Sequence, residues 1–141
     1  MKAIVRLLAD DDLGATRERV SDDIAPEYLS AFDAIETDPN QLLAAMVDGE
    51  DVIGTLQLSF IPGLARGGAL RGQIEAVRVD RNRRSDGLGE RLFQWAIAQC
   101  CKRGCRLVQL TTDRQREDAH RFYDRLGFVP THIGYKLTLG E

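Results

Sequence analysis

The sequence predicts one α/β (α+β) domain whose mixed, mostly antiparallel sheet is flanked by helices. Three observations lead to this prediction. Residues 41–60 read as two strands joined by Asp48-Gly49, a dipeptide typical of hairpin turns. A strand, a helix and a second strand follow between Ile74 and Thr112, which is the order of a crossover connection. The chain has 141 residues and no repeat or Ser/Pro-rich linker, so we expect a single domain spanning 1–141.

The first half is predicted to contain two helices, the hairpin and a loop. Ile4, Leu7 and Leu8 lie at helical spacing, so the first helix is short and begins near the N-terminus. The second helix has a proline in its first turn and stops before Asp38-Pro39. In order, the expected elements are a helix from Met1, a helix from Pro26, strands at Gln41–Val47 and Asp51–Phe60, and a loop over 62–68.

The second half is predicted to alternate strands with helices. Gly104 and Gly127 stop its two helices, as glycine commonly does after a last helical turn. The charged residues Glu75 and Arg78 interrupt the apolar alternation of its first strand, so a β-bulge is expected between them. In order, the expected elements are strand Ile74–Val79, helix Gly87–Arg103, strand Leu107–Thr112, helix Asp118–Leu126, and a mostly extended segment Val129–Leu139 with a turn or bulge at Gly134.

Composition and charge exclude several classes of protein. The net charge of −3 argues against a chain that mainly coats nucleic acid, because such proteins carry a basic surplus. No stretch approaches the roughly 20 apolar residues of a membrane span, and the N-terminus lacks a signal-peptide cleavage site. The three cysteines are crowded together, which favours a reducing compartment over a disulfide framework, and they complete no metal site. We therefore expect a cytoplasmic protein that binds no metal, no nucleic acid and no membrane.

The segment from Val77 to Leu92 carries the most chemical information. A strand ends near Val79, a polar loop follows, and Gly87 and Gly89 open a helix. Free N–H groups and the dipole at a helix N-terminus attract anions such as phosphate, and glycine lets such a group approach the backbone. A glycine-rich loop that serves close helix–strand packing explains the same two glycines about equally well.

Two motifs resemble those of the GNAT superfamily of acetyl-CoA-dependent N-acetyltransferases. Arg84-Ser-Asp-Gly-Leu-Gly89 is similar to the family's Arg/Gln-x-x-Gly-x-Gly/Ala motif, and Ala119-His-Arg-Phe-Tyr-Asp-Arg-Leu-Gly-Phe128 is similar to its Ala-x-x-Phe/Leu-Tyr-x-x-x-Gly-Phe signature. They stand in the family's usual order and separation, and the resemblance spans roughly Gln41 to Leu139. A narrower resemblance, to a bacterial branch of unassigned substrate, rests on Leu8-Ala-Asp-Asp11, Gln73-Ile-Glu75 and Leu110-Thr-Thr-Asp113.

The resemblance implies the GNAT fold, acetyl-CoA as cosubstrate, and acetyl transfer to a primary amine. In that fold the strand through Val77 and Val79 splays from the strand at Leu107–Thr112, and the thioester lies in the wedge between them. The first of these strands hydrogen-bonds the pantetheine arm, loop N–H groups hold the pyrophosphate, and Arg83 or Arg84 reaches an outer phosphate. The implied cofactor-binding residues are Val77, Arg78, Val79, Arg83, Arg84, Ser85, Asp86, Gly87, Leu88, Gly89 and Arg116.

Two side chains are expected to move protons. Tyr123 occupies the position of the family's thiolate-protonating tyrosine, and the pKa of a phenol is close to that of a thiol leaving group. The alternative is that Tyr123 only packs beside Phe122, with its hydroxyl satisfied locally. Glu75 is the expected general base, with a pKa raised by burial, against the alternative of an exposed strand position. The resemblance thus implies direct transfer with Glu75 as base and Tyr123 as acid.

Two departures from the family pattern lead to further expectations. Arg116 stands where many members have an asparagine, and an arginine there can contact coenzyme A or an acidic acceptor. The helix from Met1 leaves no residues for the strand that normally opens the fold, so the hairpin is expected to form an exposed sheet edge. Apolar residues of the hairpin, namely Leu42, Ala44 and Val52, favour a homodimer through that edge.

The acceptor is expected to be a small molecule or a protein amine. The competing hypothesis is a catalytically inactive GNAT domain that binds acetyl-CoA as a regulatory or interaction module. Turnover of acetyl-CoA against a panel of amines separates these two functions. A DNA-binding regulator is a third class, but the sequence has neither a helix-turn-helix nor the basic surplus that this class requires.

Overall fold

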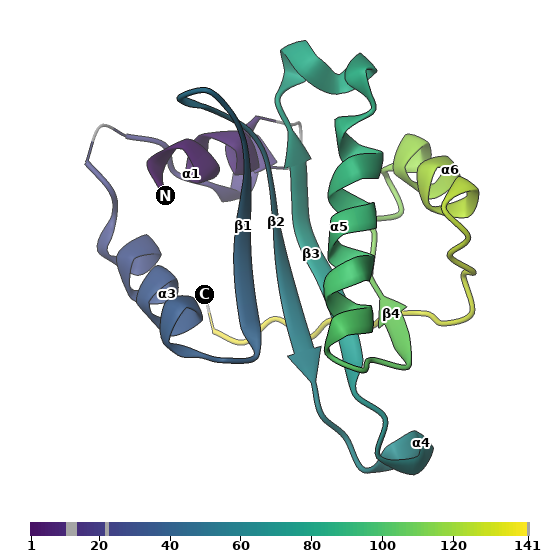
Figure 1. Cartoon of the computed structure of the whole chain (residues 1–141). Coiled ribbons are helices and arrows are strands. Elements are labelled where there is room, and N and C mark those ends of the chain that lie inside the picture. Colours follow the sequence, from purple (N-terminus) through teal and green to yellow (C-terminus); the bar gives the residue numbers. More distant parts are fainter. Residues whose placement is uncertain (11–13, 22, 141) are drawn as a thin grey trace.

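The computed structural model describes residues 1–10, 14–21 and 23–140, except for the side chain of Ser85. A sheet with helices on both faces forms the body of the molecule (Figure 1). In order, the elements are α1 (Lys2–Ala9), α2 (Gly14–Arg17), α3 (Pro26–Thr37), β1 (Gln41–Asp48), β2 (Asp51–Ile61), α4 (Ala65–Gly68), β3 (Arg71–Val79), the 3-10 helix η1 (Arg81–Asp86), α5 (Leu88–Lys102), β4 (Leu107–Gln109) and α6 (Glu117–Arg125).

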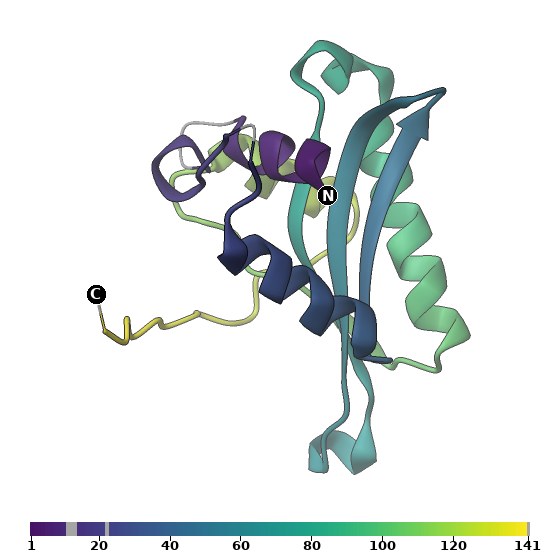
Figure 2. The ribbon, with the colours of Figure 1, turned by 90° about the vertical axis from the view of Figure 1, so that its left-hand side faces the viewer.

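Four strands form one sheet in the order β1-β2-β3-β4. β1 and β2 are the antiparallel hairpin, β3 pairs antiparallel with β2, and β4 joins in parallel with β3 after the crossover through α5. α5 lies on one face of the sheet, and α1 and α3 lie on the other (Figures 1 and 2). This confirms the predicted mixed, mostly antiparallel sheet, and it places β1 at one edge, as expected.

The core lies between the sheet and α5. Its fully or almost fully buried members are Leu56, Leu58, Phe60, Ile74, Leu92, Phe93, Ala96 and Cys100. Gly72 allows β3 and α5 to approach closely, because a Cβ at this position would lie 2.3 Å from the Cys100 Sγ atom. The cysteines are free thiols, and burial raises the pKa of Cys100 to about 12, so this thiol is a neutral core side chain.

Two strand boundaries differ from the prediction by more than one residue. β3 starts earlier than expected, at Arg71, because residues 71–73 pair both with residues 59–61 of β2 and with residues 107–109 of β4. β4 ends at Gln109 instead of Thr112, since this parallel pairing stops there. Both differences concern how far two strands run side by side, which neither strand's own residues reveal.

The ends of the chain give one confirmation and one correction. The helix expected from Met1 is confirmed as α1, and among the described residues no strand precedes it. The mostly extended segment expected over Val129–Leu139 does not form the last strand of the sheet, so that part of the prediction is wrong: residues 126–140 contain neither helix nor strand. The apolar alternation of that segment is real, but the segment pairs with none of the described strands.

Candidate active site

The first part of the site is an open strand edge on β3. β3 pairs with β4 only as far as Gln73, which stands opposite Gln109. The residues that follow, 74–79, lie beside β2 on one side, and on the other side no described strand pairs with them. The carbonyls of Val77 and Val79 accept hydrogen bonds from the side chains of Arg78 and Arg84. Other N–H and C=O groups on that side have no strand partner and can bind an extended ligand that adds to the edge like a strand. The splaying expected at Val77 and Val79 is thus present.

A β-bulge lies within this open segment. The register with β2 shifts between Thr55 and Gln57, and Ala76 has a positive φ of 53°. A bulge inserts an unpaired residue and twists the strand, so it changes which way the following side chains point. The bulge separates Glu75 from Arg78, and the interrupted apolar pattern of β3 predicted it there.

The second part of the site is the start of α5, close to the end of β3. η1 leads into Gly87, whose positive φ of 72° turns the chain into the helix. A Cβ at Gly87 would meet no atom within 4 Å, so the space beside it is open. The first N–H groups of α5, from Leu88 onward, have no acceptor within the helix and can bind an anion. A Cβ at Gly89 would lie 3.6 Å from the Phe122 ring, so Gly89 also serves close packing of α5 on α6.

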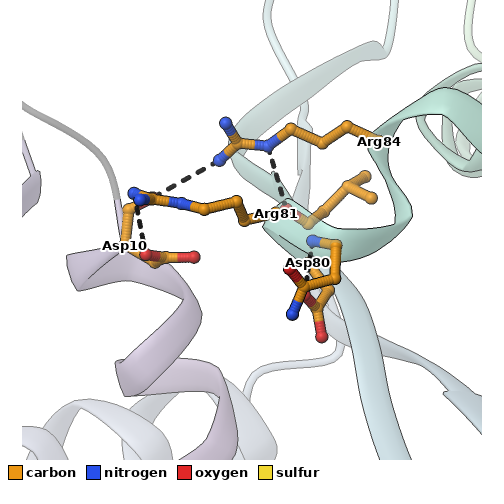
Figure 3. A network of polar contacts seen from close by, with 6 residues as sticks. Asp10, Asp80, Arg81 and Arg84 are labelled. Carbon is orange, nitrogen blue, oxygen red and sulfur yellow. Dashed lines mark hydrogen bonds and ion pairs between the residues drawn. The ribbon is translucent and has the colours of Figure 1, made fainter.

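The arginines of η1 bind protein groups in this structure (Figure 3). Arg81 forms an ion pair with Asp10, with 3.0 Å between Nη2 and Oδ1. Arg84 donates a hydrogen bond of 3.4 Å to the carbonyl oxygen of the same Asp10. Arg83 forms an ion pair with Asp48 at the end of β1, with 2.7 Å between Nη1 and Oδ2. These contacts join the loop to α1 and to the hairpin. Arg83 and Arg84, the two arginines expected at a phosphate, therefore also hold the loop in place.

Asp10 is the residue of this network that sequence reasoning left without a role. It ends α1 and belongs to the Leu8-Ala-Asp-Asp11 motif, of which Asp11 lies outside the described residues. The side chain of Ser85, expected to help bind the cofactor, also lies outside them. The contacts of Asp10 show that this motif joins the N-terminal helix to the loop before α5.

Tyr123 lies on α6 within a cluster of aromatic rings. The neighbouring rings are those of Phe93, Phe122 and Phe128, with centroid distances of 5.5, 5.7 and 6.2 Å. Burial raises the pKa of the Tyr123 phenol, and the positive charges of Arg116 and Arg78 oppose this effect more weakly. Within the described residues, the structure gives the hydroxyl no hydrogen-bond partner. The phenol is therefore protonated at neutral pH, and no local acceptor of the kind assumed by the packing alternative holds it.

Tyr123 and the open segment of β3 both pack against the core. Val77, Val79 and Tyr123 all pack against the cluster between the sheet and α5. Arg116 stands at the N-terminal end of α6, and its charge acts on Tyr123 together with that of Arg78 on β3. The structure therefore brings these sequence-predicted residues from β3 and α6 into one region.

Glu75 is exposed, so the burial expected for a general base is wrong. Its carboxylate is instead held by a chain of two side-chain amides, here called the amide chain. Gln109 Nε2 donates to Gln73 Oε1 at 2.8 Å, and Gln73 Nε2 donates to Glu75 Oε1 at 2.5 Å. Ile74 points into the core against α5, so Gln73 and Glu75 face the opposite side of the sheet.

The amide chain is part of a polar row that crosses all four strands. Gln41, Ser59, Gln73 and Gln109 stand opposite one another on successive strands. Gln41 Oε1 accepts hydrogen bonds from the Ser59 hydroxyl and from Gln57 Nε2, both at 2.9 Å. Sequence reasoning missed this row, because the four residues come together only once the register of the sheet is known.

A cleft of about 490 Å³ lies between α1 and the ends of β2 and β3, and Arg6, Asp10 and Asp80 are among its lining residues. Over the ranges that the structure describes, no group of three His, Cys, Asp or Glu side chains is arranged to hold a metal ion. Over the same ranges, no helix has the length and apolar character needed to cross a membrane.

Comparisons with known proteins agree with this arrangement. The model of the acetyltransferase (GNAT) family matches residues 3–128. An aminoalkylphosphonate N-acetyltransferase from Salmonella typhimurium is 29% identical over 112 residues, which cover 79% of this chain and 72% of that protein. A glucosamine 6-phosphate N-acetyltransferase from Trypanosoma brucei brucei is 35% identical over 77 residues, covering 55% and 50%. A crystal structure described as a transcriptional regulator from Bacillus halodurans C-125 is 43% identical, covers 98% and 92%, and has a TM-score of 0.95.

Proposed function

This chain belongs to the acetyltransferase (GNAT) family, and we propose that it transfers an acetyl group from acetyl-CoA to the primary amine of a small acceptor. The observation that carries the proposal is the open edge of β3 at 74–79 beside the start of α5. This combination suits a ligand built of amides and phosphates. The strand edge offers alternating donors and acceptors to the amides, and the helix start offers N–H groups to the phosphates.

The proposed binding mode divides acetyl-CoA among three elements. The open edge of β3 holds the pantetheine arm, N–H groups between Arg84 and Gly89 hold the pyrophosphate, and the start of α6 supplies a positive side chain. When bound, the thioester supplies an electrophilic carbonyl and a sulfur leaving group. The residues proposed to hold it are Val77, Arg78, Val79, Arg83, Arg84, Ser85, Asp86, Gly87, Leu88, Gly89 and Arg116.

Two side chains are proposed to move protons in a direct transfer. Glu75 accepts the proton of the acceptor's ammonium group, directly or through water, and its exposure lets an acceptor reach it. The amine nitrogen then bonds to the acetyl carbon while the C–S bond breaks, Tyr123 gives its phenol proton to the sulfur, and the second proton, which the acetylated nitrogen loses, returns to the Tyr123 phenolate through water. The amide chain of Gln109 and Gln73 supports this assignment, because it fixes the direction of the Glu75 carboxylate.

The acceptor is proposed to carry an anionic group as well as an amine. Two relatives are named for aminoalkylphosphonate and glucosamine 6-phosphate, which combine an amine with a phosphorus oxyanion. In this chain Arg71 shares the face of β3 that carries Gln73 and Glu75, since alternate strand residues point the same way. The four residue-to-residue steps from Arg71 to Glu75 span about 13 Å, and the long side chain of Arg71 shortens the gap between its guanidinium and the Glu75 carboxylate.

Initial rates of acetyl-CoA turnover with matched pairs of amines test this function. We expect faster turnover with 2-aminoethylphosphonate than with ethylamine, and with glucosamine 6-phosphate than with glucosamine. Arg71→Gln should remove this preference and leave the calorimetric affinity for acetyl-CoA unchanged. Equal wild-type rates for the amines with and without the anionic group would refute the proposed acceptor class but not the acetyltransferase activity.

The second candidate is a catalytically inactive domain that binds acetyl-CoA and acts as a regulatory or interaction module. The description of the Bacillus halodurans relative as a transcriptional regulator favours it. Calorimetry and turnover together separate the two functions. Tight acetyl-CoA binding with no acetylated product from any amine would support the module and refute the enzyme.

We also propose a cytoplasmic homodimer. The three free cysteines support a reducing compartment. The position of β1 at the edge of the sheet supports pairing with a second copy. However, Leu42 and Ala44 pack against the core, so this edge offers less apolar surface than the sequence suggested.

A further inference from the structure

The turn that leads from the end of α5 into β4 (Figure 1) brings two cysteines together. The N–H of Cys105 donates to the carbonyl oxygen of Cys100 at 2.9 Å. The N–H of Gly104, which has a positive φ of 78°, donates to the carbonyl oxygen of Cys101 at 3.1 Å. These hydrogen bonds define a Schellman motif, in which a side chain of the last helical turn commonly contacts the one that follows the glycine. In this chain the two residues at that contact are Cys100 and Cys105.

The two sulfur atoms approach the same point above Gly72 on β3. A Cβ at Gly72 would lie 2.3 Å from the Cys100 Sγ atom and 3.8 Å from the Cys105 Sγ atom, so both sulfurs lie beside the space that glycine leaves free. Burial is the largest cause of the raised pKa of Cys100, and the Cys105 thiol adds to it through charge and hydrogen bonding. The thiols are therefore neighbours, and their proximity is what formation of a disulfide requires.

The two thiols differ in their access to solvent. Cys100 is only 1% exposed and belongs to the core, whereas Cys105 is half-buried and packs at the margin of the core. A small oxidant in solution therefore reaches the Cys105 sulfur first, since oxidation of a cysteine follows its exposure. Cys100 is shielded from the oxidant but lies beside the sulfur that is oxidised, which is the position of a resolving cysteine.

We propose that Cys100 and Cys105 are a redox pair, which a hydroperoxide converts into a reversible disulfide. With hydrogen peroxide, the Cys105 sulfur attacks one oxygen, the O–O bond breaks, and a sulfenic acid and one water form. The Cys100 sulfur then displaces the hydroxyl group from the Cys105 sulfur, and this group leaves as a second water with the Cys100 proton. The two thiols thereby lose two electrons and two hydrogen atoms, and the peroxide is reduced to water. A dithiol reductant reverses the bond by thiol–disulfide exchange.

The disulfide joins the end of α5 to the start of β4. Gly72, beneath the two sulfurs, stands opposite Val108, and the pairing of β3 with β4 ends at the next residue. The bond therefore forms at the place where the two strands begin to part. A reversible bond also agrees with a reducing compartment, where disulfides are usually transient and redox-sensing. This proposal does not depend on the proposed enzymatic activity.

Peptide mapping of the full chain after treatment with hydrogen peroxide tests the pair. Trypsin cleaves after Lys102 and Arg103, so Cys100 and Cys105 fall on different peptides, which only a disulfide holds together. Cys101→Ser is the decisive variant, because Cys101 is exposed and its removal leaves one possible disulfide within the chain. In protein of monomer mass from a non-reducing gel, we expect linked peptides from both wild type and Cys101→Ser. Dithiothreitol should separate them.

Cys105→Ser is the matched control and should give no linked peptides. Neither Cys101 nor Cys105 is fully buried, so both variants should fold. Three results would overturn the proposal. The first is an absence of linked peptides from Cys101→Ser and wild type alike. The second is a link in the wild type that disappears in Cys101→Ser, which would pair Cys101 with Cys105 instead. The third is recovery of Cys105 as a sulfinic acid beside an intact Cys100 thiol, which would show that the two sulfurs do not meet.

Discussion

Replacing Tyr123 with phenylalanine separates the chemistry of the phenol from the packing of its ring. The substitution removes one oxygen and leaves the three aromatic neighbours, whose centroids lie 5.5 to 6.2 Å away, in contact with a ring of the same size. Among the described residues the hydroxyl has no hydrogen-bond partner, so its loss leaves no buried group unpaired. We therefore expect the free energy of unfolding to change by less than about 1 kcal/mol.

The catalytic effect of Tyr123→Phe should be much larger than its effect on stability. Loss of a general acid typically lowers a rate by about 10²-fold or more, and a factor of ten to a hundred corresponds to about 1.4 to 2.7 kcal/mol in the activation free energy. The affinity for acetyl-CoA should be unchanged. Because burial raises the pKa of Tyr123, the phenol is protonated up to and above its usual value of about 10. The wild-type rate should thus fall only above that pH, and the variant should lack this alkaline limb.

Single-turnover kinetics measures the effect of Tyr123→Phe on the chemical step itself. The matched control is Phe128→Leu, which disturbs the same aromatic cluster without removing a proton donor. This variant should have a lower melting temperature and a nearly unchanged kcat. Equal single-turnover rates for wild-type protein and Tyr123→Phe, with an identical alkaline limb, would refute the role of Tyr123 as acid. Tyr123 would then be a packing residue only.

The remaining substitutions test other parts of the site and the fold. Glu75→Gln should remove the acidic limb of the rate–pH profile, whereas Gln73→Leu should lower kcat and keep that limb; an unaltered limb in Glu75→Gln would exclude Glu75 as the base. Gly87→Val places a branched side chain at a positive φ of 72° and beside the proposed pyrophosphate site, so calorimetry should show severely weakened acetyl-CoA binding by a folded protein. Gly72→Ala should cost about 1 to 3 kcal/mol of stability in urea unfolding, because its Cβ would lie 2.3 Å from the Cys100 Sγ atom, and Cys100→Ala should restore most of the loss.

Features with strong local signals could be predicted from the sequence. α5 is expected over Gly87–Arg103 and observed over Leu88–Lys102. The prediction succeeds because the apolar stripe of the helix and the glycines at its two ends all lie within this one segment. The bulge in β3 was predictable because a charge on each side of it broke the alternation of the strand. Such patterns depend on the conformation of one segment and need no knowledge of its neighbours.

Features that depend on the register between strands could not be predicted. The exposure of Glu75 and the amide chain that holds it follow from which residues of β3 and β4 stand opposite each other. The early end of β4 at Gln109 has the same origin. For residues 129–139, the alternation indicated a strand that the structure does not form. A strand also needs a partner, and local patterns do not specify where that partner lies.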